Sequence, residues 1–128
     1  MNGLERWHHV MEKGDMEALY DLLHPDCVFI SPVVHTPQEG REITYAYLRA
    51  ANKALSEDFK YVREVVQDNH AVLEFTVKVD GIFVNGVDII TFEGDQIVEF
   101  KVMVRPLKAV NAVWKQMGEM LEQLKAAS

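Results

Sequence analysis

Residues 84–105 read V-N-G-V-D-I-I-T-F-E-G-D-Q-I-V-E-F-K-V-M-V-R and predict two long antiparallel strands joined by a turn at residues 93–95. One acidic residue, Asp88, interrupts a run of branched apolar side chains in the first of these strands. An aspartate is uncommon in such a position, because strand interiors favour β-branched and aromatic residues. The fold and the function of the chain are best approached from this hairpin.

Side chains alternate between the two faces of a strand, so Asp88 shares a face with Ile90 and Phe92. One face of the following strand is wholly apolar and consists of Phe100, Val102 and Val104. We expect this row to face the interior and the face of Asp88 to continue it. The pattern therefore predicts a carboxyl group inside an apolar concavity.

Burial would make Asp88 a candidate acid or base. Loss of hydration disfavours the charged form of a carboxyl group, so the pKa of Asp88 should rise and the group could exchange a proton near neutral pH. The alternative is an aspartate that pairs with a polar partner and holds a strand or binds water. Because an unpaired buried acid is costly, we favour the functional interpretation.

The remaining pattern predicts helices and strands in an order typical of an α+β domain. Alternation is clearest in residues 71–79, and an Asp-Gly turn at residues 80–81 leads into the central hairpin. Apolar residues of the last helix recur every three or four positions and predict a packed stripe that includes Leu107 and Trp114. The expected helices are 4–13, 15–23, 41–55 and 107–124, and the other expected strands are 27–34, 59–66 and 71–79.

Composition limits the classes of function. With 128 residues the chain is expected to form a single domain over residues 1–128. A formal net charge of -7 argues against nucleic acid and anionic membranes as partners. Cys27 is the only cysteine and the five histidines lack ligand spacing, so we predict neither a disulfide nor a metal site. The start of the chain lacks the apolar core of a signal peptide, which predicts a cytoplasmic location.

The order of elements resembles the nuclear transport factor 2 fold, a group that includes ketosteroid isomerases, SnoaL-like polyketide cyclases and limonene epoxide hydrolases. The likeness covers nearly the whole chain and rests on several short features in the same order. The resemblance implies a cone-shaped, curved antiparallel or mixed sheet wrapped around the N-terminal helices, with a C-terminal helix. The features are Gly14-Asp15, Pro25-Asp26, Ser31-Pro32-Val33 followed by Pro37 and Gly40, and the hairpin stretch V-D-I-I-T-F-E-G-D-Q-I-V.

Comparison with ketosteroid isomerases assigns possible roles to three positions. Asp88, four residues before Phe92, is similar to the protonated aspartate that stabilises the oxyanion in that family. Ser31 stands where the family has its general base, and Trp7 stands where it has a catalytic tyrosine. Since two of the three positions are changed, steroid isomerisation by that mechanism is not expected.

The other relatives leave the chemistry open. Limonene epoxide hydrolases resemble this chain around the same strand, but Gly86 replaces the arginine of their Arg-x-Asp motif and no second inward carboxylate follows. SnoaL-like cyclases need chiefly a buried acid or base against a flat polyketide, and the sequence is compatible with that requirement. No Gly-rich phosphate loop or dinucleotide motif is present, so we predict no cofactor.

These considerations give a candidate site. We predict Asp88, His35 and Ser31 as catalytic residues, with His35 as a base that could activate the serine hydroxyl or a surface histidine without that role. Trp7 has a donor-only indole nitrogen that could reach a ligand carbonyl. The residues predicted to bind the ligand are Trp7, Met11, Phe29, Tyr47, Phe75, Val77, Phe100 and Val102.

Two hypotheses of function follow. One is a small enzyme, such as an isomerase, cyclase or hydrolase, that acts on an apolar carbonyl-bearing or cyclic metabolite with Asp88 as acid or base. The other is a non-catalytic ligand-binding or assembly module of the same fold. The outer face of the central hairpin bears apolar residues that need a cover, either the last helix or a second copy of the chain, and we predict a homodimer through Val87, Ile89 and Met103.

Overall fold

The predicted hairpin forms as strands β5 (Ile82–Glu93) and β6 (Gln96–Arg105) in the computed structural model. The structure describes residues 2–127 and the surroundings of side chains as far as residue 123. The two strands pair antiparallel, as expected. Their register joins the two predicted inward rows, with Asp88 opposite Val102, Ile90 opposite Phe100 and Gly86 opposite Val104.

Four further strands extend this hairpin into a curved mixed sheet with the order β2-β1-β6-β5-β4-β3. Every neighbouring pair is antiparallel except β1 and β6, which run parallel. The α+β class and the curved sheet predicted from the sequence are confirmed. The added strands are β1 (Leu23–Ile30), β2 (Gln38–Glu39), β3 (Glu57–Gln67) and β4 (His70–Val79).

The turn between β4 and β5 shows why its sequence is Asp-Gly. Asp80 has φ 53° and Gly81 has φ 76°. Tight hairpin turns that match the twist of the flanking strands need positive φ at both central residues, which Gly adopts freely and Asp tolerates. The predicted turn is therefore confirmed at the level of the backbone.

The first strand lies earlier in the chain than predicted. We expected a strand over residues 27–34 and a preceding helix that reached residue 23, but β1 begins at Leu23 and ends at Ile30. Pro25 lies within β1, where the pairing with β6 is irregular between Leu23 and Val28. Proline has no N–H to donate to a neighbouring strand, so it is tolerated in a strand where the regular pairing is interrupted. Pro32 lies beyond the strand, in a bend.

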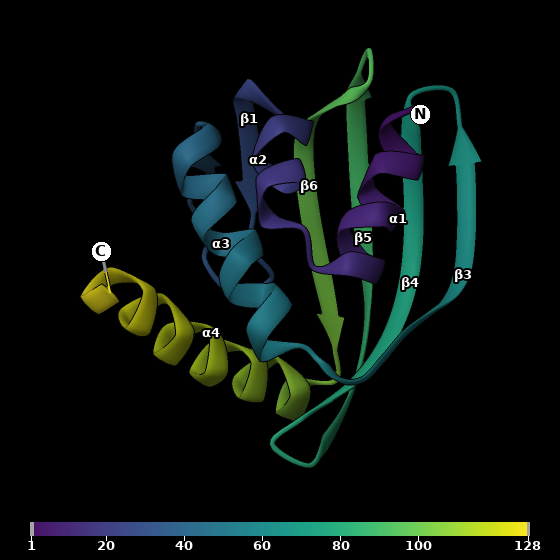
Figure 1. Ribbon diagram of the computed structural model, residues 1–128. Coiled ribbons are helices and arrows are strands. Elements are labelled where there is room, and N and C mark those ends of the chain that lie inside the picture. The colour runs from purple at the N-terminus through teal and green to yellow at the C-terminus, as the bar shows by residue number, and fades with distance from the viewer. Residues whose placement is uncertain (1, 128) are drawn as a thin grey trace.

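Figure 1 shows α1, α2 and α3 on the concave face of the sheet, while α4 runs from the end of β6 past α3 and away from the strands. Helix α1 begins with a capping box, in which the Asn2 side chain accepts from the Glu5 N–H and the Glu5 side chain accepts from the Asn2 N–H, and ends at Gly14 in the left-handed conformation. Within residues 2–127 no helix is long and apolar enough to cross a membrane. The helices are α1 (Gly3–Lys13), α2 (Met16–Leu22), α3 (Arg41–Ala54) and α4 (Leu107–Ala127).

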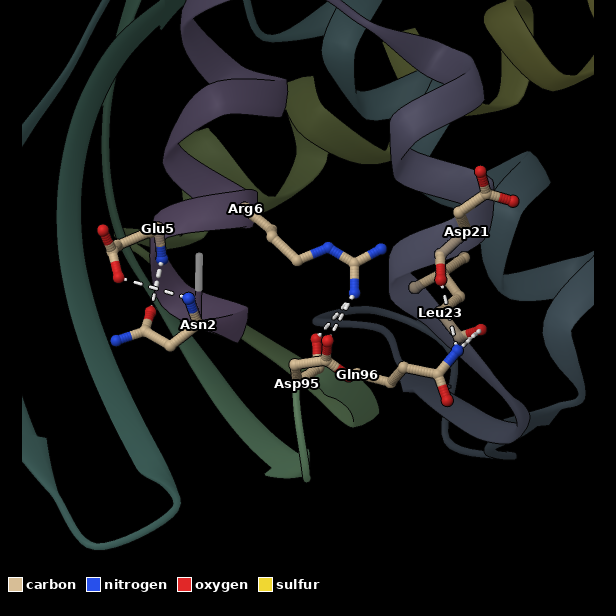
Figure 2. A network of polar contacts seen from close by, with 7 residues as sticks. All are labelled: Asn2, Glu5, Arg6, Asp21, Leu23, Asp95 and Gln96. Atoms are coloured by element: carbon tan, nitrogen blue, oxygen red, sulfur yellow. Dashed lines mark hydrogen bonds and ion pairs between the residues drawn. The ribbon is translucent and has the colours of Figure 1, made fainter.

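Polar contacts fasten the N-terminal helices to one end of the sheet (Figure 2). Arg6 of α1 donates to the main-chain carbonyl of Asp95 at 3.1 Å and pairs with its carboxylate at 3.4 Å. Gln96 donates to the carbonyl of Asp21 at 3.2 Å and to that of Leu23 at 3.5 Å. These contacts bind the turn between β5 and β6 to α1 and to the junction of α2 and β1, which fixes how α1 lies over the sheet.

The buried side of α4 differs from the prediction. Leu107 and Trp114, two members of the predicted stripe, are 75% and 62% exposed, whereas Ala109, Ala112 and Val113 are buried. The three buried residues pack with strand residues in a second core cluster next to the main one. The side of α4 that packs on the sheet thus carries mostly small side chains, which let a helix approach a sheet closely.

Candidate active site

A cavity of about 150 Å³ lies between the concave face of the sheet and the helices. Its walls come from α1, α2, α3, α4 and five of the strands, and the segment 31–34 also contributes. Nearly all of the lining side chains are apolar. Seven of the eight residues predicted to bind a ligand line this cavity: Trp7, Met11, Phe29, Tyr47, Phe75, Phe100 and Val102.

Val77 is the exception. Its side chain is buried, but it packs in the second core cluster with residues of α4 and does not line the cavity. The alternation in β4 placed Val77 correctly on the inward face. The curvature of the sheet and the position of α4, which the local pattern does not encode, give this part of the face to the core instead of to the cavity.

Asp88 lies at the inner wall of the cavity, as the sequence predicted. It is 6% exposed, and its cross-strand neighbours are Leu73 on β4 and Val102 on β6. Burial raises the pKa of Asp88 to about 7, and a hydrogen bond from Tyr61 opposes part of that rise. The carboxyl group can therefore hold or release a proton near neutral pH, which is the property that a general acid or base needs.

Tyr61 of β3 belongs to the candidate site and was not predicted from the sequence. Its hydroxyl donates to Asp88 Oδ2 at 2.6 Å and accepts from Trp7 Nε1 at 3.0 Å. Burial and the neighbouring Asp88 raise the pKa of Tyr61, so the phenol stays neutral. A signal was present, because Phe59 and Tyr61 alternate and could share an inward face. An irregularity in the pairing of β3 with β4 after Tyr61 breaks the alternation that would have supported it.

Trp7 occupies a different role from the one expected of its indole nitrogen. The ring lines the cavity and packs against Phe100 with the ring centroids 4.9 Å apart. The N–H that was expected to reach a ligand carbonyl is donated to Tyr61. The polar end of Trp7 is thus used inside the protein, and its apolar ring is the part that a ligand can contact.

The structure does not bring Ser31 and His35 together. Ser31 lines the cavity, and its Oγ accepts from the N–H groups of Val33 at 3.1 Å and Val34 at 3.2 Å, which shapes the segment after β1. His35 is exposed in the same segment and lies outside the lining of the cavity. Within the described side chains no hydrogen bond joins the two. Their catalytic roles stay predictions, and for His35 the position favours the alternative of a surface histidine.

Gly86 leaves room for the aromatic ring of Phe75, which lines the cavity. A Cβ atom built at Gly86 would lie 2.5 Å from the ring of Phe75 and 2.8 Å from the carbonyl oxygen of Met103. Such distances are far below ordinary contacts, so β5 needs glycine here for Phe75 to reach the cavity. The arginine that limonene epoxide hydrolases have at the similar position could not occupy this space.

Comparisons with known proteins agree with this architecture. A family model described as a SnoaL-like domain matches residues 4–100. The chain belongs to the SnoaL-like family. Its fold is that of the nuclear transport factor 2-like superfamily, as expected from the sequence. No curated protein matches this SnoaL-like chain.

Solved structures add detail. A steroid delta-isomerase from Pseudomonas aeruginosa is similar to this chain, with 36% identity and a TM-score of 0.91, over 97% of this chain and 92% of that one. An uncharacterised bacterial protein with a cystatin-like fold from Silicibacter pomeroyi is 33% identical, with a TM-score of 0.83 over 91% of this chain and 83% of that one. A protein of unknown function from Burkholderia xenovorans, described as NTF-2 like, is 19% identical, with a TM-score of 0.65 over 85% of this chain and 88% of that one.

Proposed function

We propose that this SnoaL-like protein binds a small apolar metabolite with a carbonyl group or a ring and that Asp88 transfers a proton to and from it. One observation carries the proposal: among the described residues that line the cavity, a single carboxyl group stands among mostly apolar side chains, and burial raises its pKa to about 7. Groups with such shifted pKa values cluster at functional sites. At neutral pH the acid and its conjugate base are both populated, so one group serves both directions of proton transfer.

The proposed reaction is the transfer of a proton at a carbon atom of the ligand by the carboxyl group in the cavity. In its ionised form Asp88 takes a proton from the carbon next to a carbonyl group, and the electron pair of that C–H bond moves to the carbonyl oxygen. The protonated Asp88 then returns the proton to the same carbon or to a conjugated one. The other polar side chains of the described lining that could donate to the oxygen are Ser31, Tyr47 and Asn52.

The size of the cavity limits the buried part of the ligand. A cavity of about 150 Å³ suits one six-membered ring. A ligand as large as a steroid would bury one ring near Asp88 and extend toward α4 and the segment 31–34. The similarity to a protein named as a steroid delta-isomerase supports proton transfer as the class of chemistry. Ser31 stands at the position of the general base of the ketosteroid isomerases, which argues for a different substrate or for different residues in the roles of acid and base.

The proposal is tested by hydrogen exchange in deuterated water. Simple cyclic ketones, cyclic enones and a β,γ-unsaturated ketosteroid are incubated with the protein, and NMR follows the loss of protons next to the carbonyl group. We expect the exchange rate to rise as the pH rises through about 7, because the ionised form of Asp88 is the base. Asp88→Asn should reduce this exchange at least 100-fold. Equal exchange with the two proteins for every compound would contradict the proposal.

The second candidate is a ligand-binding module without catalysis, and the scarcity of polar groups in the cavity favours it. The same experiment separates the two. Saturable binding of these compounds, measured by the fluorescence of Trp7 and Trp114 at the cavity and without exchange dependent on Asp88, would support the module. Exchange that saturates with ligand concentration and depends on Asp88 would support the enzyme.

We also propose that the outer sheet face forms a homodimer. Val87 lies opposite Met103 on that face, and Met103 is 52% exposed. Arg63 pairs with Glu74 at 3.4 Å beside them, so the face carries both signs of charge and can be complementary to a second copy. We expect Met103→Glu to convert a dimer to a monomer in analytical ultracentrifugation, whereas Leu107→Glu, on the exposed side of α4, should not. A monomeric wild-type protein would refute the dimer.

A further inference from the structure

The hydrogen bonds behind Asp88 have a direction that chemistry fixes. An indole N–H can only donate, so Tyr61 must use a lone pair of its hydroxyl oxygen for Trp7. The hydroxyl has one proton, and Asp88 Oδ2 is the acceptor at 2.6 Å. The chain therefore runs as Trp7 to Tyr61 to Asp88, and each hydrogen points toward the carboxyl group.

This direction makes the two oxygens of Asp88 unequal. Oδ2 accepts the Tyr61 hydrogen, so a proton bound to Oδ2 would leave two hydrogens between the same pair of oxygens. Oδ1 makes no hydrogen bond to a described side chain, and it is not among the fully buried atoms without a partner. Since Asp88 lines the cavity, Oδ1 is the oxygen that a ligand meets.

We propose that Trp7 and Tyr61 are positioning residues that hold the proton of neutral Asp88 on Oδ1, so that a proton taken from the ligand is returned to it from the same oxygen. This inference rests on the proposed function, which it deepens by naming the atom that carries the proton. It also describes the ligand. The ligand atom that faces Asp88 is a carbon that gives up a proton in the first step and accepts a proton in the return step.

The step balances without any further reactant. The ligand C–H bond breaks, its electron pair forms the enolate, and the hydrogen binds Oδ1. In the return step the O–H bond at Oδ1 breaks, and the enolate carbon forms a new C–H bond as its electron pair moves back. Tyr61 keeps its own hydrogen throughout, because burial and Asp88 raise its pKa.

Few other ionisable groups of the described residues lie near the hydrogen-bond chain of Trp7, Tyr61 and Asp88. Leu73 and Val102 flank Asp88 on the neighbouring strands and carry no charge. On the far side of Tyr61 the ring of His8 stands edge-on with the ring centroids 6.0 Å apart. Among the described residues, the ionisable groups that contact Asp88 or Tyr61 or line the same cavity are Tyr61 itself, His8 with its partner Glu64 at 2.7 Å, and Tyr47.

The test reads Asp88 itself by infrared spectroscopy on protein with ¹³C-labelled aspartate carboxyl groups and no ligand. Between about pH 5.5 and pH 9 the ordinary aspartates stay ionised, so the C=O band that disappears on raising the pH belongs to a protonated buried carboxyl. Asp88→Asn identifies it by removing it. In the wild type the C=O oxygen is Oδ2, which accepts from Tyr61, and we expect one band at the low wavenumber of a hydrogen-bonded carbonyl.

Three variants test the role of the hydrogen-bond chain. Tyr61→Phe should move the band to higher wavenumber and raise the pH midpoint by about one unit, since the bond from Tyr61 lowers the pKa of Asp88. Trp7→Phe should give two bands, because the hydroxyl hydrogen of Tyr61 can then turn away from Asp88 and the hydroxyl oxygen can accept a hydrogen bond from a protonated Oδ2. Tyr47→Phe removes a hydroxyl from the same cavity without touching this chain and should change neither quantity. An unchanged band and midpoint in Tyr61→Phe would overturn the inference.

The exchange assay separates this inference from the proposed function. If the two proposals hold, the pH midpoint of ligand exchange rises in Tyr61→Phe by as much as the infrared midpoint. A shifted infrared midpoint with an unshifted exchange profile would refute the role of Trp7 and Tyr61 in proton return. A wild-type protein that exchanges no ligand proton would refute the proposed function, while the infrared bands would still report where the Asp88 proton lies.

Discussion

Replacing Asp88 with asparagine is expected to stabilise the folded protein by up to about 4 kcal/mol at about pH 9 and to have little effect at about pH 4. The pKa of Asp88 is raised from 3.8 to about 7 by burial. Below about pH 4 the carboxyl is neutral in the folded and the unfolded chain. As the pH rises toward 7 the unfolded chain loses this proton first, so wild-type stability falls, and it levels off above the folded pKa. Asparagine does not titrate and avoids that loss.

Urea unfolding of the two proteins at several pH values measures this effect. The difference in the free energy of unfolding between Asp88→Asn and the wild type should grow between about pH 4 and pH 7 and then stay constant. Asp26→Asn removes an exposed carboxyl group from β1 and should change stability by less than about 0.5 kcal/mol at neutral pH. A difference that does not vary with pH would show that Asp88 is not a buried titrating group.

The second large effect is expected for Phe100→Ala, which should lower the free energy of unfolding by about 3 to 5 kcal/mol. Phe100 is 2% exposed and packs against Trp7 and Phe29. Its removal would join a new void to the existing cavity, and the surrounding strands and helices cannot collapse far into it. Chemical denaturation at neutral pH measures the loss, and the widened cavity should admit larger cyclic ligands.

Phe83→Ala is the matched control, because it removes the same side chain from β5 where that side chain is 59% exposed. We expect it to cost less than about 1 kcal/mol. If the two substitutions destabilised the protein equally, the position of Phe100 at the centre of the core would be wrong.

Local patterns predicted much of the site. The period of two in β5 and β6 placed Asp88 and Val102 on the same inward face, and the register confirms it. The sequence did not predict that Tyr61 would meet Asp88, because the two are 27 positions apart and join only across β4. It also gave no reason to separate Ser31 from His35, since a segment of four residues can turn either way.

The sequence by itself determined the order of helices and strands, the tight turns and the burial of one acid, because these depend on neighbours a few positions away. Only the tertiary structure decided which side of α4 is buried, that β1 runs parallel to β6, and that Trp7, Tyr61 and Asp88 form one chain of hydrogen bonds. Those features depend on the packing of segments distant in the chain, where the fit of whole surfaces outweighs the preference of any single residue.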